Sequence, residues 1–127
     1  MLVIDDEPLL GRAVQRALSR EHVVVVVSNA AEALSRLVAG DRYDLVLCDL
    51  MMPDMDGIEF HRRLSEVLPE EASRVVFITG GALTTRVEAF FSRVPNTLLD
   101  KPIAIEGLCA LVERRIRGDG ETTARSA

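Results

Sequence analysis

The sequence predicts an α/β fold, a single domain in which a doubly wound, five-stranded parallel sheet is covered by five helices. Short apolar runs rich in β-branched residues alternate along the chain with segments whose apolar residues recur at helical spacing. Each run is apolar on both faces, as expected of strands that helices cover on two sides. The chain has 127 residues, 48% of them hydrophobic, which is enough for one core and too little for two domains.

Five apolar runs are the predicted strands, at residues 2–4, 23–27, 45–48, 75–78 and 97–99. We expect the second run to lie at or near an edge of the sheet, and the last run is the weakest. Because a helical segment separates each run from the next, successive strands are expected to be parallel and joined by right-handed crossovers.

The predicted helices span residues 9–18, 30–38, 58–68, 85–94 and 103–117. Pro8 suits the first turn of the first helix, and Gly40 and Gly118 are placed to end the second and the last. Three pairs have capping-box spacing: Asn29 with Glu32, Asp56 with Glu59, and Thr85 with Glu88. Residues 118–127 are small and polar, so we predict an unpacked, flexible tail after a domain at residues 1–117.

Charge and cysteine content exclude several classes of function. The 15 Lys and Arg residues are outnumbered by 20 Asp and Glu, and no basic stripe is available to neutralise a nucleic-acid backbone. Cys48 and Cys109 stand far apart in the sequence and form no CxxC motif, which argues against a zinc site and against a disulfide framework. We therefore expect the protein in the reducing cytoplasm. The longest apolar run is too short to cross a membrane, and the amino end lacks the basic region of a signal peptide.

Polar residues stand where the predicted strands end. Asp5 and Asp6 follow the first strand, Asp49 ends the third, Thr79 ends the fourth and Lys101 follows the fifth. In a doubly wound sheet these carboxyl ends form the ligand-binding edge. Crowded carboxylates repel one another, and a hard cation such as Mg²⁺ relieves that cost. A lysine and a hydroxyl beside them suit a phosphoryl group, which an aspartate could accept covalently.

Simpler interpretations exist for each residue taken alone. Asp5 and Asp6 could be only a turn before a helix, and Thr79 only a hydroxyl at a strand end. Asp56 is interpreted as a cap residue and not as a metal ligand. His61, beside two arginines, is interpreted as part of a solvated helix face without a role.

Four motifs occur together in order. They are Asp5-Asp6, Asp49 at the start of "DLMMPDMDG", Thr79, and Lys101-Pro102. With them, residues 1–117 resemble the receiver domains of two-component response regulators. The resemblance implies a flavodoxin-like fold with strand order 2-1-3-4-5 and a cis peptide bond before Pro102.

The same resemblance implies a role for each site residue. Asp49 would be the phosphoacceptor, with Thr79 and Lys101 contacting the phosphoryl group. Asp5, Asp6, Asp49 and the backbone carbonyl of Met51 would hold Mg²⁺. We expect Asp49 to be the one carboxylate that faces both the metal and Lys101.

The donor implied by the resemblance is a phosphohistidine, on a histidine kinase or a phosphotransfer domain. The domain itself would catalyse only its own phosphorylation and dephosphorylation, and a homodimer is compatible with the family. The chain starts abruptly in the first strand, and residues 75–102 resemble the corresponding segment of receivers that are joined to hybrid sensor histidine kinases. Both features favour a carboxy-terminal receiver excised from such a kinase. The alternatives are a stand-alone regulator and a binding module that is never phosphorylated.

Three positions depart from the family pattern or modify it. Leu98, three before the lysine, stands where an aromatic residue commonly couples phosphorylation to a change of surface. In the family, two positions flank the water that hydrolyses the aspartyl phosphate. Here they are Met51 and Gly81, and neither has a polar side chain. We therefore expect slow loss of the phosphoryl group.

Two other classes of protein fit the sequence poorly: phosphatases with an aspartate nucleophile, and flavodoxin-like electron carriers. A haloacid-dehalogenase-like phosphatase carries D-x-D after its first strand, where this chain has Asp5-Asp6-Glu7. A flavodoxin-like electron carrier needs a Ser/Thr-rich loop there, and three carboxylates would repel a flavin phosphate.

Overall fold

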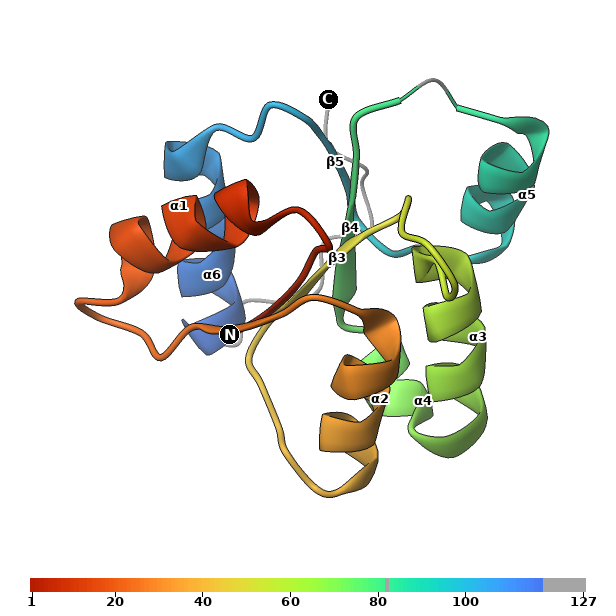
Figure 1. Ribbon diagram of the computed structural model, residues 1–127, viewed down its shortest axis with the longest axis horizontal. Helices are drawn as coiled ribbons and strands as arrows, with labels where there is room; N and C mark the ends of the chain where they lie inside the picture. Colours follow the sequence, from red (N-terminus) through yellow and green to blue (C-terminus); the bar gives the residue numbers. More distant parts are fainter. Residues whose placement is uncertain (82, 118–127) are drawn as a thin grey trace.

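A computed structural model describes residues 1–81 and 83–117 (Figure 1). The predicted tail at residues 118–127 and the predicted helix stop at Gly118 lie outside the described residues. Within the described ranges there are five strands and six helices. In chain order these are β1 (Leu2–Ile4), α1 (Pro8–Leu18), β2 (Val25–Val27), α2 (Ala30–Val38), β3 (Val46–Asp49), α3 (Gly57–Val67), α4 (Pro69–Ala72), β4 (Val75–Thr79), α5 (Thr85–Arg93), β5 (Leu98–Asp100) and α6 (Ile105–Arg117).

The strands form one parallel sheet in the order β2-β1-β3-β4-β5, which confirms the predicted fold class and places β2 at an edge. Its register brings the polar strand ends together. Ile4 pairs with Cys48, so Asp5 and Asp49 follow at the same level of neighbouring strands. Thr79 pairs with Asp100, which puts Lys101 just beyond the same edge.

The sheet separates two apolar clusters, because successive residues of a strand point to opposite faces. Leu2 and Ile4 belong to the cluster under α2, α3 and α5, whereas Val3 belongs to the cluster under α1 and α6. Figure 1 shows α1 and α6 together on one side of the sheet and α2 and α3 on the other. No helix in the described ranges is long and apolar enough to span a membrane.

The prediction of five helices was wrong by one short helix, α4, which follows α3 directly. Pro69 lacks an amide hydrogen and restricts Leu68, whose φ of −141° and ψ of 70° break the helix there. The proline then serves as the first residue of a new turn, with Glu70 and Glu71 close to its amino end. The predicted helix at residues 58–68 thus corresponds to α3 alone, and α4 begins just beyond it.

The predicted helix starts were mostly confirmed. Asn29 accepts a hydrogen bond from the amide of Glu32 and Asp56 from that of Glu59, over 2.8 and 2.9 Å. The cap predicted at Thr85 was wrong, because Thr84 is the residue whose hydroxyl accepts from the helix, at 3.2 Å. Two adjacent threonines offer the same chemistry, and spacing alone does not separate them.

The interpretation of His61 as a solvated residue was also wrong. Its ring lies half-buried, 5.2 Å from that of Phe90 and 5.9 Å from that of Phe77. Burial lowers the pKa of His61, although a hydrogen bond with Asn96 opposes this effect. The histidine therefore joins α3 to α5 and β4 as part of an aromatic cluster.

Candidate functional site

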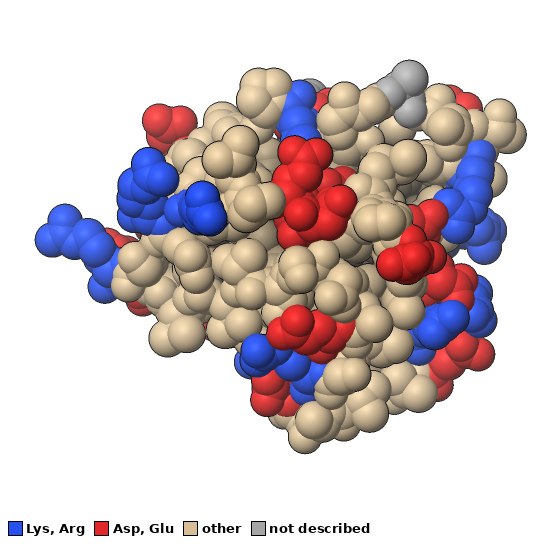
Figure 2. Space-filling model, in the orientation of Figure 1, with Lys and Arg blue, Asp and Glu red and all other residues tan. Residues whose placement is uncertain are grey.

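Three carboxylates gather at the carboxyl ends of β1 and β3, as predicted. Asp5, Asp6 and Asp49 each offer an oxygen atom within 4.8 Å of those of the other two. Figure 2, drawn in the orientation of Figure 1, shows acidic side chains gathered near the centre of the visible face. Asp5 and Asp49 are only 2% and 4% exposed, whereas Asp6 is exposed to solvent.

Hydrogen bonds leave one oxygen of Asp5 available to a cation. The amide of Glu7 donates to its Oδ1 over 2.9 Å, but its buried Oδ2 has no hydrogen-bond partner. An unpartnered buried carboxylate oxygen is costly, and two further carboxylates beside it raise the cost. Hard divalent cations prefer such oxygen donors, so Mg²⁺ fits this group of residues.

Asp49 is held between an amide and an ammonium group. Its Oδ1 accepts from the amide of Met51 over 3.0 Å, and its Oδ2 accepts from Nζ of Lys101 over 2.9 Å. We expected Asp49 to be the one carboxylate that faces both the metal and Lys101, but Oδ2 of Asp5, which belongs to the same candidate metal group, also lies 3.8 Å from this Nζ. The hydrogen bond nevertheless distinguishes Asp49 from the more distant Asp5.

Burial and charge shift the pKa values of this group. Burial raises the pKa of Asp5 to about 6, and the charge of Asp49 adds to this, while the Glu7 amide and Lys101 oppose it. Burial acts to lower the pKa of Lys101, but its hydrogen bond to Asp49 and the nearby carboxylates outweigh burial and raise it. Lys101 therefore keeps its positive charge at neutral pH.

The raised pKa of Asp5 predicts a stability change with pH in metal-free protein. Because the folded state binds this proton more tightly than the unfolded chain, stability falls as pH rises from about 4 to about 6. Asp5→Asn should therefore raise the free energy of unfolding at neutral pH by about 1–3 kcal/mol, and the gain should shrink in acid. Urea unfolding at several pH values measures both.

Mg²⁺ provides the matching control. It should stabilise the wild type by binding the folded state, and this gain should be lost in Asp5→Asn. Asp6→Asn, which changes an exposed residue, should alter metal-free stability by no more than about 0.5 kcal/mol. Equal stability of Asp5→Asn and wild type at neutral pH would contradict the assigned burial cost.

The loop after Asp49 is shaped by a close backbone approach. The amide of Gly57 donates to the carbonyl of Leu50 over 3.0 Å. A Cβ atom on Gly57 would lie 3.0 Å from the carbonyl oxygen of Asp49 and 3.0 Å from Cα of Leu50. Glycine at position 57 thus allows α3 to begin against the phosphoacceptor candidate.

Thr79 and Lys101 lie at the carboxyl ends of the neighbouring strands β4 and β5. The amide of Lys101 donates to the carbonyl of Thr79 over 2.8 Å, and the Lys101-Pro102 peptide bond is cis, as expected. The buried hydroxyl of Thr79 accepts from the amide of Gly81 over 3.4 Å. The structure thus brings Asp5, Asp6, Asp49 and Lys101 into contact range and holds Thr79 at the adjacent strand end.

Some site contacts had no clear signal in the sequence. The amides of Glu7 and Met51 each stand two residues after the aspartate they bind, a spacing typical of local turns. The ion pair between Arg86 and Asp56 joins residues 30 positions apart, and nothing in the local sequence indicates it.

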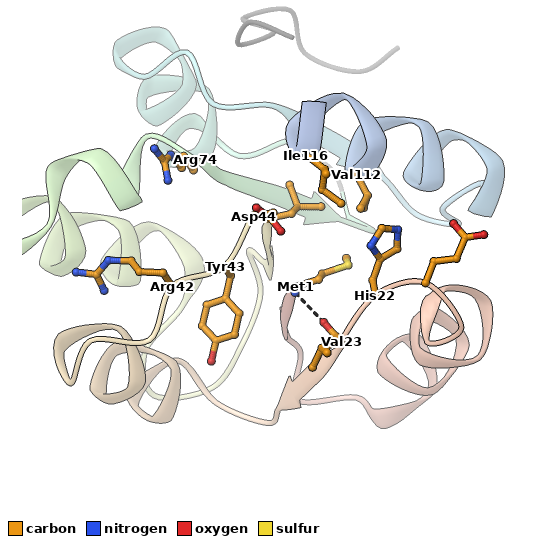
Figure 3. Close-up of a pocket in the computed structure, with 11 residues that line it drawn as sticks. Met1, His22, Val23, Arg42, Tyr43, Asp44, Arg74, Val112 and Ile116 are labelled. Atoms are coloured by element: carbon orange, nitrogen blue, oxygen red, sulfur yellow. Dashed lines mark hydrogen bonds between the residues drawn. The ribbon is translucent and has the colours of Figure 1, made fainter. Parts of the chain in front are cut away.

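A separate pocket of about 480 Å³ lies near the amino ends of the strands (Figure 3). Met1, His22, Asp44 and Ile116 are among its lining residues. Acidic, basic and apolar side chains mix there, and none of the predicted site residues lines it. The predicted site residues lie instead at the carboxyl ends of the strands.

The sequence model of the response regulator receiver domain matches residues 1–113. The chain belongs to this family. A receiver domain from Clostridium thermocellum, known from a crystal structure, is 26% identical and superposes with a TM-score of 0.75, over 93% of this chain and 94% of that one.

Two curated relatives are longer proteins, of which this chain matches a part. The transcriptional regulatory protein ResD of Bacillus subtilis is 30% identical over 97% of this chain and 50% of its own length. A protein-glutamate methylesterase/protein-glutamine glutaminase of Pseudomonas fluorescens is 44% identical over 61% of this chain and 23% of its own length. The chain thus spans half or less of these relatives.

Proposed function

We propose that this receiver domain accepts a phosphoryl group on Asp49 from a phosphohistidine, with Mg²⁺ held by Asp5, Asp6, Asp49 and the backbone carbonyl of Met51. The observation that supports it most is the position of the Asp49 carboxylate, hydrogen-bonded to Lys101 and within 4.8 Å of two further carboxylates. Lys101 and Thr79 are the proposed contacts of the phosphoryl group.

The reaction is a phosphoryl transfer between two side chains. A carboxylate oxygen of Asp49 attacks phosphorus, the phosphorus–nitrogen bond to the donor imidazole breaks, and the imidazole leaves with the bonding electron pair. Mg²⁺ held by Asp5, Asp6 and Asp49 would neutralise charge on the carboxylates and on the phosphoryl oxygens. Lys101 exchanges its hydrogen bond to Asp49 Oδ2 for one to a phosphoryl oxygen. The hydroxyl of Thr79 donates a hydrogen bond to a second phosphoryl oxygen.

The wider context of the domain stays a prediction. We propose residues 1–117 as the receiver, which lies in the cytoplasm and accepts its phosphoryl group from a histidine kinase or a phosphotransfer domain. An origin in a hybrid sensor histidine kinase is the preferred context, with a stand-alone regulator second.

Intact-mass measurement after incubation with acetyl phosphate tests the function. We expect the mass gain of one phosphoryl group with Mg²⁺ and none with EDTA in place of the metal. A binding module that keeps the pocket but is never phosphorylated would show no gain in either condition. Unchanged mass with Mg²⁺, under conditions that label a known receiver, would exclude the proposed function.

A further inference from the structure

An ion pair ties α5 to the loop that follows Asp49. Nη1 of Arg86, in the first turn of α5, lies 2.6 Å from Oδ2 of Asp56, and Nη2 lies 3.5 Å from Oδ1. Figure 1 shows α5 beside the amino-terminal end of α3, where Asp56 is the cap residue. Among the described residues, no other ion pair joins α5 to another element.

Asp56 is itself fixed to the site. Its Oδ1 accepts from the amide of Glu59, and the next residue, Gly57, donates its amide to the carbonyl of Leu50, which directly follows Asp49. Burial acts to raise the pKa of Asp56, but the hydrogen bonds from Arg86 and from backbone amides outweigh burial and lower it. Arg86 therefore binds a charged group that lies next to the hydrogen bond between Gly57 and the loop after Asp49.

Both halves of α5 are held by apolar packing, and one ion pair is added at its amino-terminal turn. Phe90 and Phe91, in its carboxy-terminal half, are buried and pack edge-to-face against Phe77. In the amino-terminal turn, Val87 is buried in the same core, whereas Thr85 and Arg86 are exposed, so the ion pair is the contact that joins this turn to Asp56. The chain runs from Thr79 to this turn through residues 80–84, which include two consecutive glycines.

We propose that the Arg86–Asp56 ion pair is a latch, which holds the amino-terminal turn of α5 in the arrangement that accompanies a free Asp49 carboxylate. In this arrangement the Thr79 hydroxyl accepts from Gly81 and Lys101 binds Asp49. When Thr79 turns to an oxygen on Asp49, its hydrogen bond from the Gly81 amide is lost, and the latch opposes the shift that follows at the amino-terminal turn of α5. The latch rests on the function proposed above, because it requires a ligand at Asp49.

Beryllofluoride with Mg²⁺, a stable stand-in for the phosphoryl group, is the probe for this latch. Arg86→Ala should bind it more tightly than wild type, and the amide of Val87 should report the change by NMR titration. Both partners are partly exposed, with side chains 59% and 26% accessible, so the expected gain is about 2- to 5-fold in affinity. Arg63→Ala removes a comparably exposed pair within α3, with Glu59, and should leave the affinity unchanged.

Asp56→Asn removes the charge but keeps a good cap residue, so it should give the same gain as Arg86→Ala. The double variant should add nothing further, because both changes remove one interaction. Raising NaCl to about 1 M should bring the wild type toward the variants by screening the pair.

Two results would overturn the latch while leaving the function intact. One is wild-type affinity or weaker binding in both single variants, and the other is a fully additive double variant. Failure of the wild-type protein to bind beryllofluoride at all would instead count against the function proposed for Asp49, so the two failures are distinguishable.

Discussion

Asp49→Asn abolishes the gain of a phosphoryl group from acetyl phosphate, because the amide lacks the nucleophilic oxygen that attacks phosphorus. We expect a loss of at least about 100-fold in labelling rate, limited by the detection of the mass shift. The change is small in size, and the residue is 4% exposed and hydrogen-bonded to both Met51 and Lys101. An asparagine can keep the Met51 contact, so the fold should survive.

Asp54→Asn is the matched control for this experiment. Asp54 lies in the same loop, is exposed and has a φ of 67°, a backbone conformation that asparagine also tolerates. Its labelling should equal that of the wild type. Peptide mapping is also required, since Asp5 lies 3.8 Å from Lys101 and is the nearest competing carboxylate. A phosphoryl group found on Asp5, or labelling that persists in Asp49→Asn, would refute the assignment of the phosphoacceptor.

The site residues were predictable because each lies at a strand end. In a parallel sheet, residues that follow different strands meet at one edge whatever the length of the helices between them. The register that places Ile4 beside Cys48 and Thr79 beside Asp100 then brings Asp5, Asp49 and Lys101 together. Strand identity alone was therefore sufficient to predict which side chains gather.

The features that the sequence did not reveal depend on packing between distant elements. Arg86 and Asp56 meet because α5 and α3 lie side by side, and charge alone does not select this partner from the other carboxylates. His61 is half-buried because Phe77 and Phe90 reach its ring from two other elements. The short helix α4 has the sequence Pro-Glu-Glu-Ala, which is too short to show a periodic apolar pattern, so the sequence did not reveal it.

The second large effect concerns how long the phosphoryl group stays on Asp49. Hydrolysis needs a water held in line with phosphorus, and polar side chains near the site can orient it. Met51 offers a thioether and is 63% exposed, whereas Gly81 offers no side chain at all. We therefore expect a long-lived aspartyl phosphate in the wild type, unless the group is returned to a histidine donor.

Met51→Asn combined with Gly81→Glu should shorten that lifetime by about 10-fold or more, because positioning of a water commonly changes rates by about 10- to 1000-fold. The structure has room for both changes. Met51 is exposed, and a Cβ atom on Gly81 would meet no atom within 4 Å. Decay of the phosphorylated species, followed by intact mass with Mg²⁺ after removal of acetyl phosphate, measures the effect.

Met51→Leu combined with Gly81→Ala separates water positioning from loop rigidity. This control also adds a side chain at position 81 and changes position 51, but it provides no polar group, so its lifetime should match that of the wild type. If both double variants decay faster, the cause is the loop after Thr79 and not the oriented water. If neither does, access of water is limited by something other than these two positions, most directly by how Thr79 and Lys101 enclose the phosphoryl group. Faster decay in the polar variant alone would show that this receiver keeps its phosphoryl group because Met51 and Gly81 leave the attacking water unoriented.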